Sequence, residues 1–291
     1  MKALSLNYKT FLSDINLDYY KSIALFRISV VLIALIDFSS VWIDLNIFIS
    51  DTSLIPWELG LIETEYYNFL KPLFDFLISN NIRISTFISI IAILYITALI
   101  SSGLGFHKNK SIFFAIIFQI ILYRSISNFN YGYDNFITMS LFYCLIFPVA
   151  REFSLDKWKT KQNSANELPF YFSLTNFLRT HLSIIYFVSG LAKAVDKNWW
   201  NGNAIWRSMA NLNDFIYLSP FILLVLSCST VIMEMSYPFI AFSKFKNLKR
   251  ILIIHIILMH LGIGIVLGLS SFASIMIVWN ITAFYKDFTE E

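Results

Sequence analysis

Residues 84–103 read ISTFISIIAILYITALISSG and contain no charged side chain. An α-helix rises about 1.5 Å per residue, so a helix of this length reaches across the roughly 30 Å of hydrocarbon in a bilayer. The stretch lacks the alternation of polar and apolar side chains that a membrane β-barrel strand requires. It therefore predicts a membrane-spanning helix.

Similar apolar runs lie on both sides of this stretch. Apolar side chains make up 57% of the 291 residues and charged side chains only 14%, whereas a soluble domain carries about 25% charged residues. Because helices satisfy their own backbone hydrogen bonds in lipid, we expect an all-α integral membrane bundle of about eight transmembrane helices. The fourth and eighth of the expected spans are short for a full crossing: 22–42, 84–103, 111–128, 135–150, 170–193, 217–241, 251–270 and 271–285.

Lysine and arginine are distributed unevenly between the expected loops. If both termini are cytoplasmic, 14 of the 22 fall in inside segments, 4 fall in outside segments, and 4 lie within or at the edges of spans. Cytoplasmic loops carry an excess of these residues, so the distribution predicts cytoplasmic N- and C-termini. No repeat or Gly/Ser-rich linker divides the chain, and we expect a single domain over residues 1–291.

Several classes of site and partner are not indicated. Cys144 and Cys228 lie in apolar runs and predict buried thiols rather than a disulfide or metal ligands. His255 and His260 are five residues apart, so they do not share a helix face as the histidines of a zinc motif do, and we expect no metal site. The expected partner is the lipid bilayer, with no nucleic acid.

Ionisable side chains inside the expected spans cost at least about 2.5–3.5 kcal/mol each, so each needs a partner or a function. Arg27 lies close enough to the start of its span to reach the cytoplasmic interface. Asp37 lies on a different face, where we expect it to meet another helix. In span 170–193, four residues recur at offsets of seven, four and three and predict a polar stripe that faces the bundle interior: Arg179, Tyr186, Gly190 and Lys193.

Lys193 ends this stripe in the sequence SGLAK, whose small residues leave room for a ligand or a neighbouring helix. Desolvation disfavours an ammonium group, so Lys193 is a candidate base; alternatively, its side chain extends to the outer interface. Glu234 lies inside the sixth expected span. We expect it to pair with Arg179, Lys193 or a histidine.

The third expected outside loop contains NWWNGNAIW, which begins at residue 198. Tryptophan concentrates at membrane interfaces, so Trp199 and Trp200 fit an interfacial belt. The alternative is that these rings, together with a turn at Gly202, form a lid beside a site.

Three motif-bearing regions follow one another along the chain: YRSISNFNYGYDN (123–135) with FSLDKW (153–158), IIYFVSGLAK (184–193) with WWNGNAI (199–205), and STVIMEMSYPF (229–239). Together they resemble the HTTM (horizontally transferred transmembrane) family, which is related to the membrane domain of vitamin K-dependent gamma-carboxylase. The resemblance covers roughly residues 20–285.

The resemblance implies candidate chemistry. The carboxylase uses a lysine in the matching Gly-x-x-Lys context as the base that activates reduced vitamin K, and Lys193 occupies that place. Near the start of its fourth span the carboxylase has an important histidine, where this chain reads Tyr133-Asp134-Asn135. The candidate catalytic residues are therefore Lys193, Asp134 and Glu234, and a reduced quinone such as a menaquinol is the implied cofactor. The candidate substrate-binding residues are Arg179, Tyr186, Gly190, Trp199, Trp200, Gly202, His255 and His260.

Two functions from different classes remain open. The first is a membrane enzyme or maturation factor, with carboxylase-like chemistry coupled to a quinol, that acts on a peptide or lipid-soluble substrate. The second is a non-catalytic membrane partner in the secretion of, or immunity to, a peptide toxin, as in SdpB-like bacterial proteins. Both place the chain in a bacterial cytoplasmic membrane, and only the first requires Lys193 to be functional. A transporter fits less well, because no inverted repeat or glycine-broken helix pair is evident.

Overall fold

The computed structural model describes the backbone of residues 2–51, 53, 56–62, 64–125, 131–160, 173–210 and 218–289. All regular secondary structure in these residues is helical, which confirms the all-α prediction. The chain forms two compact units, Met1–Asn166 and Glu167–Glu291. That both units act as one domain stays a prediction.

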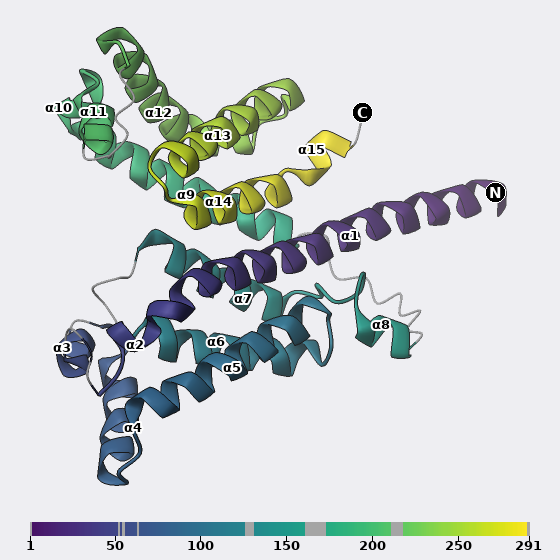
Figure 1. Cartoon of the computed structure of the whole chain (residues 1–291). Coiled ribbons are helices and arrows are strands. Elements are labelled where there is room, and N and C mark those ends of the chain that lie inside the picture. Colours follow the sequence, from purple (N-terminus) through teal and green to yellow (C-terminus); the bar gives the residue numbers. More distant parts are fainter. Residues whose placement is uncertain are drawn as a thin grey trace. The chain divides into compact units, whose positions relative to one another are not determined.

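Unit 1 is built on four long helices, in which α5 packs against α1 and α6, and α7 packs against α6 and α1 (Figure 1). Its core includes the fully buried Leu99, Ala115 and Leu141. The elements of this unit are α1 (Lys2–Val41), η1 (Trp42–Asp44), α2 (Leu45–Phe48), α3 (Trp57–Ile62), α4 (Tyr67–Ser79), α5 (Ile84–Gly103), α6 (Lys108–Tyr123), α7 (Gly132–Ile146) and α8 (Leu155–Thr160).

Unit 2 is organised around α9, which packs against α12 and α14, while α13 packs against α14 and α12. The short helices α10 and α11 lie against α12, and α15 lies against α13 (Figure 1). The elements of this unit are α9 (Leu174–Val195), α10 (Lys197–Trp200), α11 (Asn203–Ala210), α12 (Pro220–Ala241), α13 (Lys246–Val266), α14 (Ser270–Ala283) and α15 (Tyr285–Thr289).

Four described segments are long and apolar enough to cross a membrane: Asp18–Asp44, Ile84–Gly103, Pro220–Ala241 and Lys246–Val266. They correspond to the first, second, sixth and seventh expected spans. The helix Ser270–Ala283 is apolar but shorter, and α6 and α7 have only 16 and 15 residues. Helix α9 has 22 residues, but its charged and polar stripe makes it less apolar than these four segments. The total of eight spans therefore stays a prediction.

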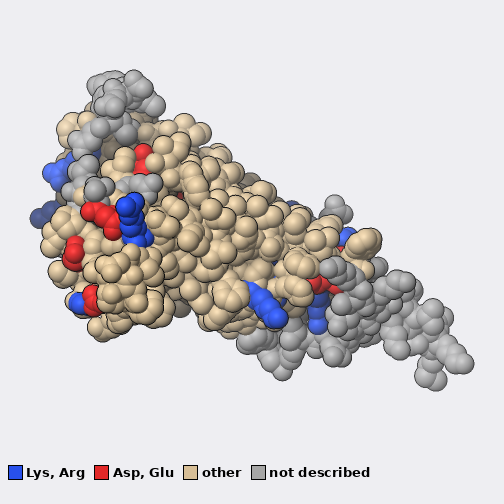
Figure 2. Space-filling model, turned by 60° about the horizontal axis from the view of Figure 1, so that its bottom comes forward, with Lys and Arg blue, Asp and Glu red and all other residues tan. Residues whose placement is uncertain are grey.

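The outer surface of these helices is apolar, as a lipid environment requires. Large side chains such as Ile36, Phe239 and Ile265 are more than two-thirds exposed. Figure 2 shows a face on which uncharged residues cover wide areas and charged residues gather in a few places. A soluble monomer rarely exposes contiguous apolar surface on this scale, so the chain is an integral membrane protein.

Asp156 of the FSLDKW segment and Lys108 hold the ends of two helices in unit 1. Both carboxylate oxygens of Asp156 accept hydrogen bonds from the main-chain N–H groups of His107 and Lys108, at 3.0 and 3.1 Å. The Lys108 ammonium in turn donates to the main-chain oxygens of Cys144, Leu145 and Phe147. Asp156 therefore caps the start of α6, and Lys108 caps the end of α7.

Arg27 has its partners inside the protein, which is one of the two possibilities that the sequence left open, the other being extension to an interface. The residue is fully buried, and its guanidinium donates to the main-chain oxygens of Val149 and Phe153. A Cβ at Gly105 would lie 2.7 Å from Arg27 Nη1, so the absent side chain makes room for the guanidinium. Carbonyl oxygens of the turn after α7 replace the water that an interface would have supplied.

Candidate functional site

Lys193 on α9 and Glu234 on α12 form a salt bridge, with Nζ 2.6 Å from Oε2. The two side chains are 20% and 6% exposed, respectively. Nζ also donates to Ser189 Oγ and lies 5.2 Å from the centroid of the Trp199 ring. The prediction that Glu234 pairs with a cation from this span is confirmed. The Lys193 side chain points at the neighbouring helix α12.

Gly190 explains how α9 and α12 come close enough for this pair. A Cβ at position 190 would lie 2.8 Å from the main-chain nitrogen of Met235 and 2.9 Å from Glu234 Cβ. The small residues before Lys193 thus admit a neighbouring helix, one of the two occupants that the sequence left open. The backbones touch where the stripe passes from Tyr186 to Lys193.

Tyr186 is the centre of a buried polar network that joins four helices. Its hydroxyl lies 2.9 Å from His260 Nε2 on α13 and accepts a hydrogen bond from Asn280 Nδ2 on α14 at 3.0 Å. Tyr237 on α12 donates to Asn280 Oδ1 at 3.0 Å, and its ring centroid lies 4.5 Å from that of Tyr186. The stripe therefore faces the interior of unit 2, as predicted.

Two members of this network, Asn280 and Tyr237, were not among the sequence candidates. Both carried a signal. Asn280 is an amide in the middle of an apolar run, and Tyr237 lies three residues after Glu234, on the same helix face. An amide inside a membrane helix needs hydrogen-bond partners from other helices.

The structure does not bring His255 to this network. His255 is exposed on α13, whereas His260 is buried. Five residues turn a helix by well over one full turn, so the two side chains point in different directions. Among the described residues, no group of three or more His, Cys, Asp or Glu side chains could hold a metal ion.

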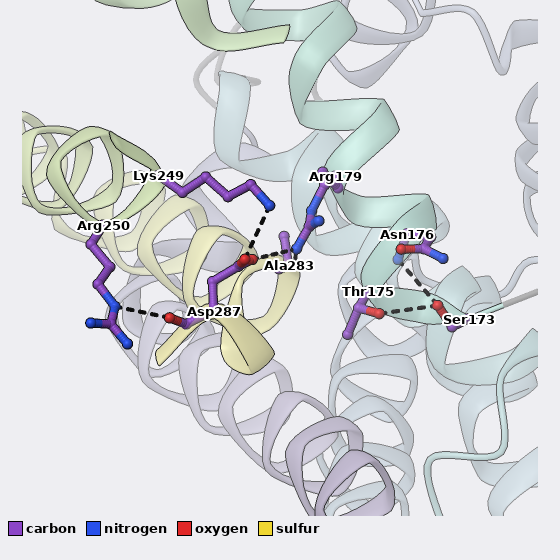
Figure 3. Close-up of polar contacts among 8 residues, drawn as sticks. All are labelled: Ser173, Thr175, Asn176, Arg179, Lys249, Arg250, Ala283 and Asp287. Carbon is purple, nitrogen blue, oxygen red and sulfur yellow. Dashed lines mark hydrogen bonds and ion pairs between the residues drawn. The ribbon is translucent and has the colours of Figure 1, made fainter. Parts of the chain in front are cut away.

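Arg179 lies at the other end of α9, in a separate cluster, so it is not brought to Lys193. Its Nη2 donates to Asp287 Oδ2 at 2.7 Å, while Lys249 Nζ donates to Asp287 Oδ1 at 3.1 Å. Arg250 Nε donates to the main-chain oxygen of Asp287 at 3.0 Å. Figure 3 shows these three cationic side chains converging on Asp287 from α9 and α13. The sequence reading had missed Asp287.

The two tryptophans of the NWWNGNAIW segment have different surroundings. Trp199 lies over the Lys193 ammonium, whereas Trp200 is exposed and donates from Nε1 to the main-chain oxygen of Ala194 at 2.8 Å. Gly202 has a φ of +80°, and a Cβ there would lie 2.8 Å from the main-chain nitrogen of Leu224. Gly202 thus makes the turn that lays this segment against α12.

Asp134 belongs to unit 1, whereas Lys193 and Glu234 belong to unit 2. It is buried in the first turn of α7, where Oδ2 accepts a hydrogen bond from the main-chain N–H of Tyr131 at 2.8 Å. Within the described part of the chain, Oδ1 of Asp134 has no hydrogen-bond partner. Asp37 on α1 is also buried and accepts from the hydroxyl of Tyr123 on α6 at 3.0 Å, which confirms that it meets another helix.

These apolar helices, with ionisable groups paired from one helix to another, define an integral membrane protein of the all-α class. The comparison with protein families goes further, because the model of the HTTM domain matches residues 20–242. The chain therefore belongs to the HTTM family, as its motifs predicted. The match includes Asp134, Lys193 and Glu234. No curated protein and no solved structure matches the chain.

Proposed function

We propose that this HTTM protein is a membrane enzyme whose Lys193–Glu234 pair removes a proton from a weakly acidic hydroxyl group of a lipid-soluble molecule. The observation that supports this most is the position of the pair between α9 and α12, where the Glu234 side chain is 6% exposed and the Lys193 side chain 20% exposed. Removing two charges from water costs several kcal/mol per ion, and a buried pair is weak support for stability. An intramembrane ion pair is therefore a candidate for function.

The chemistry of the pair suits proton removal in an apolar environment. An ammonium beside a carboxylate has no net charge. When the pair takes one proton from a neutral hydroxyl group, it acquires one positive charge beside the anion that it has made. No uncompensated charge is left in a medium where such a charge is costly. Within the pair the proton moves from Nζ to the Glu234 carboxylate, and the neutral amine that this leaves on Lys193 takes the proton of the hydroxyl group.

A reduced quinone such as a menaquinol fits the residues present. The Trp199 ring lies beside Lys193 and provides an aromatic face, and the buried Nδ1 of His260 has no hydrogen-bond partner in the described residues. Lys193 and Glu234 would hold the hydroxyl group, and Trp199 would cover it. Such a molecule supplies an acidic hydroxyl and redox chemistry that protein side chains lack.

Two substitutions of Lys193 test this function. Lys193→Arg keeps the salt bridge but cannot act as a base, because guanidinium stays protonated above pH 12. Lys193→Met removes the charge and nearly conserves the volume. The resemblance to the carboxylase implies that molecular oxygen reacts with the deprotonated quinol. We therefore expect both variants to reach the membrane and to lose menaquinol-4-dependent oxygen uptake in nanodiscs by about 10²-fold or more. The control is Lys197→Met, which changes an exposed lysine on α10.

A structural lysine predicts the opposite pattern. Lys193→Arg would then behave like the wild type, and Lys193→Met would fail to accumulate in the membrane. That result would reject the enzyme and favour the non-catalytic partner of a peptide toxin.

We also propose that the protein lies in a bacterial cytoplasmic membrane with both termini cytoplasmic. The uneven distribution of lysine and arginine supports this orientation. In a variant with Cys144→Ala and Cys228→Ala, a membrane-impermeant thiol reagent added to intact cells should label Lys197→Cys and not Lys246→Cys. Labelling at position 246 alone would reverse the orientation.

A further inference from the structure

In the buried network of unit 2, the donor and the acceptor of each hydrogen bond can be assigned, starting from Asn280. One amide atom of Asn280 lies 2.8 Å from the main-chain oxygen of Met276. A carbonyl oxygen only accepts hydrogen bonds, so this amide atom is the nitrogen, Nδ2. The other amide atom is therefore Oδ1, and the Tyr237 hydroxyl, 3.0 Å away, donates to it.

The direction continues from Asn280 through Tyr186 to His260. Asn280 Nδ2 donates to the Tyr186 hydroxyl, whose oxygen therefore acts as the acceptor. Among the described residues, the hydrogen of that hydroxyl then has one acceptor within reach, His260 Nε2 at 2.9 Å. A nitrogen that accepts a hydrogen bond carries no hydrogen, so the neutral imidazole of His260 has its hydrogen on Nδ1.

This series of hydrogen bonds ends at the Nδ1–H donor of His260. The residue is 2% exposed, and Nδ1 has no hydrogen-bond partner within the described residues. A buried donor without a partner costs about 1–3 kcal/mol, and natural proteins leave few of them. The ring lies edge-on to Phe272, with centroids 5.8 Å apart, and its contact with Tyr186 places it against the face of α9 that also carries Lys193.

We propose that His260 Nδ1–H donates a hydrogen bond to an acceptor oxygen of the lipid-soluble molecule on which the Lys193–Glu234 pair acts. The role of that molecule rests on the proposed function, but the donor and its direction rest on the hydrogen bonds alone. The site would therefore select molecules with a carbonyl, phenolic or ether oxygen over pure hydrocarbons. An N–H fixed by Tyr186 and Asn280 would also stabilise the negative charge that proton removal leaves on the bound molecule.

A matched pair of substitutions separates the two nitrogens of His260. Asparagine places its amide nitrogen near the position of Nδ1, so His260→Asn keeps a donor there and loses the contact with Tyr186. Glutamine places its amide group near the position of Nε2, so His260→Gln keeps the contact with Tyr186 and loses the donor. Both side chains are polar and similar in size, which makes each variant the folding control for the other.

The first measurement is binding of menaquinone-4, an oxidised quinone whose oxygens can only accept, followed by quenching of tryptophan fluorescence in nanodiscs. We expect His260→Asn to bind within about threefold of the wild type and His260→Gln to bind about tenfold more weakly, since one hydrogen bond is worth about a factor of ten. Squalene, a hydrocarbon, should not compete with the quinone. Equal binding by both variants would overturn the proposal and leave water as the partner of Nδ1.

The second measurement is independent of any ligand. In protein labelled with ¹⁵N at histidine, the signals missing from His260→Gln identify His260, and their chemical shifts should show a protonated Nδ1 and an unprotonated Nε2. The opposite tautomer would overturn the proposal. If the His260 results hold while Lys193→Met keeps full turnover, the binding site stands and the proposed function fails. If Lys193 is essential while both His260 variants bind alike, the reverse is true.

Discussion

The two ends of α9 use cations differently. At the N-terminal end, Arg179, Lys249 and Arg250 all contact Asp287, which uses both carboxylate oxygens and its main-chain oxygen. At the C-terminal end, Lys193 meets a single carboxylate, and the described hydrogen bonds of Glu234 involve only Oε2. All the oxygens of Asp287 thus have partners within the protein, whereas Glu234 Oε1 could accept a hydrogen bond from a further partner.

This difference in the number of partners distinguishes charged groups that stabilise the fold from charged groups that can react with a bound molecule. The Asp287 carboxylate is held by Arg179 and Lys249 and cannot exchange these partners without exposing buried charge. A single pair beside an aromatic ring can take up a proton and remain balanced by a bound anion. The substitutions below test this contrast, from the largest expected effect to the smallest.

Asp287→Asn should have the largest effect. It removes the carboxylate that Arg179 and Lys249 share and leaves these two cations, whose side chains are 16% and 11% exposed, uncompensated. Breaking a buried pair costs about 3–5 kcal/mol, and this change breaks two at once. We expect the variant to unfold at a much lower temperature in detergent or to be lost from the membrane. Asp75→Asn, which breaks an exposed pair with Lys71, should change stability by less than about 1 kcal/mol. Equal losses would mean that the Asp287 cluster is not structural.

Breaking the Lys193–Glu234 pair should cost less stability. Glu234→Gln should lower the free energy of unfolding by about 3 kcal/mol or less, because Lys193 is partly exposed and keeps its contact with Ser189. The double variant with Lys193→Met removes both charges and should recover part of that loss. Denaturation of the two single variants and the double variant gives the coupling energy, which we expect to exceed about 1 kcal/mol. Strictly additive losses would argue against a buried pair.

Gly190→Ala tests the helix contact that positions the pair. The added methyl group would press on the main chain of α12, with a cost of about 1–3 kcal/mol. The matched control is Gly262→Ala on α13, where a Cβ would meet no atom within 4 Å. There, alanine should be neutral or stabilise the helix by up to about 1 kcal/mol. Thermal unfolding of the two variants compares the positions, and similar shifts would remove the argument for close packing at Gly190.

Sequence alone predicted much of the site on α9 because helix geometry is local. The offsets of Tyr186, Gly190 and Lys193 fix them on one face, and an apolar environment makes a partner for Glu234 necessary. The sequence left three candidate partners for Glu234, because the choice among them depends on which helices pack together. The contact at Gly190 decides it in favour of Lys193.

Features that depend on distant parts of the chain were not predicted. Asp287 lies in the polar segment after the last expected span, which resembles a solvated tail, so nothing in the pattern linked it to Arg179. The same limit applied to Arg27, whose position near a span end suggested an interface. Its partners are main-chain oxygens more than a hundred residues away, and backbone groups leave no signal in a sequence.

A carboxylate outside both clusters should show the smallest effect. Asp51 is exposed and accepts hydrogen bonds from the main-chain N–H groups of Ile84 and Ser85 at the start of α5, at 3.2 and 3.5 Å. Slight burial raises the pKa of Asp51, but these hydrogen bonds outweigh it, and the pKa is lowered from 3.8. A lowered folded-state pKa stabilises the fold at pH values above the unfolded-state pKa, and this contribution is lost as the pH falls through the folded-state value.

Asp51→Asn should therefore cost no more than about 1 kcal/mol at pH 7. The difference in unfolding free energy between wild type and variant should be constant above about pH 5 and shrink toward pH 3. Other acids titrate alike in both proteins and cancel from this difference. A difference that grows as the pH falls would mean that the Asp51 carboxylate does not stabilise α5.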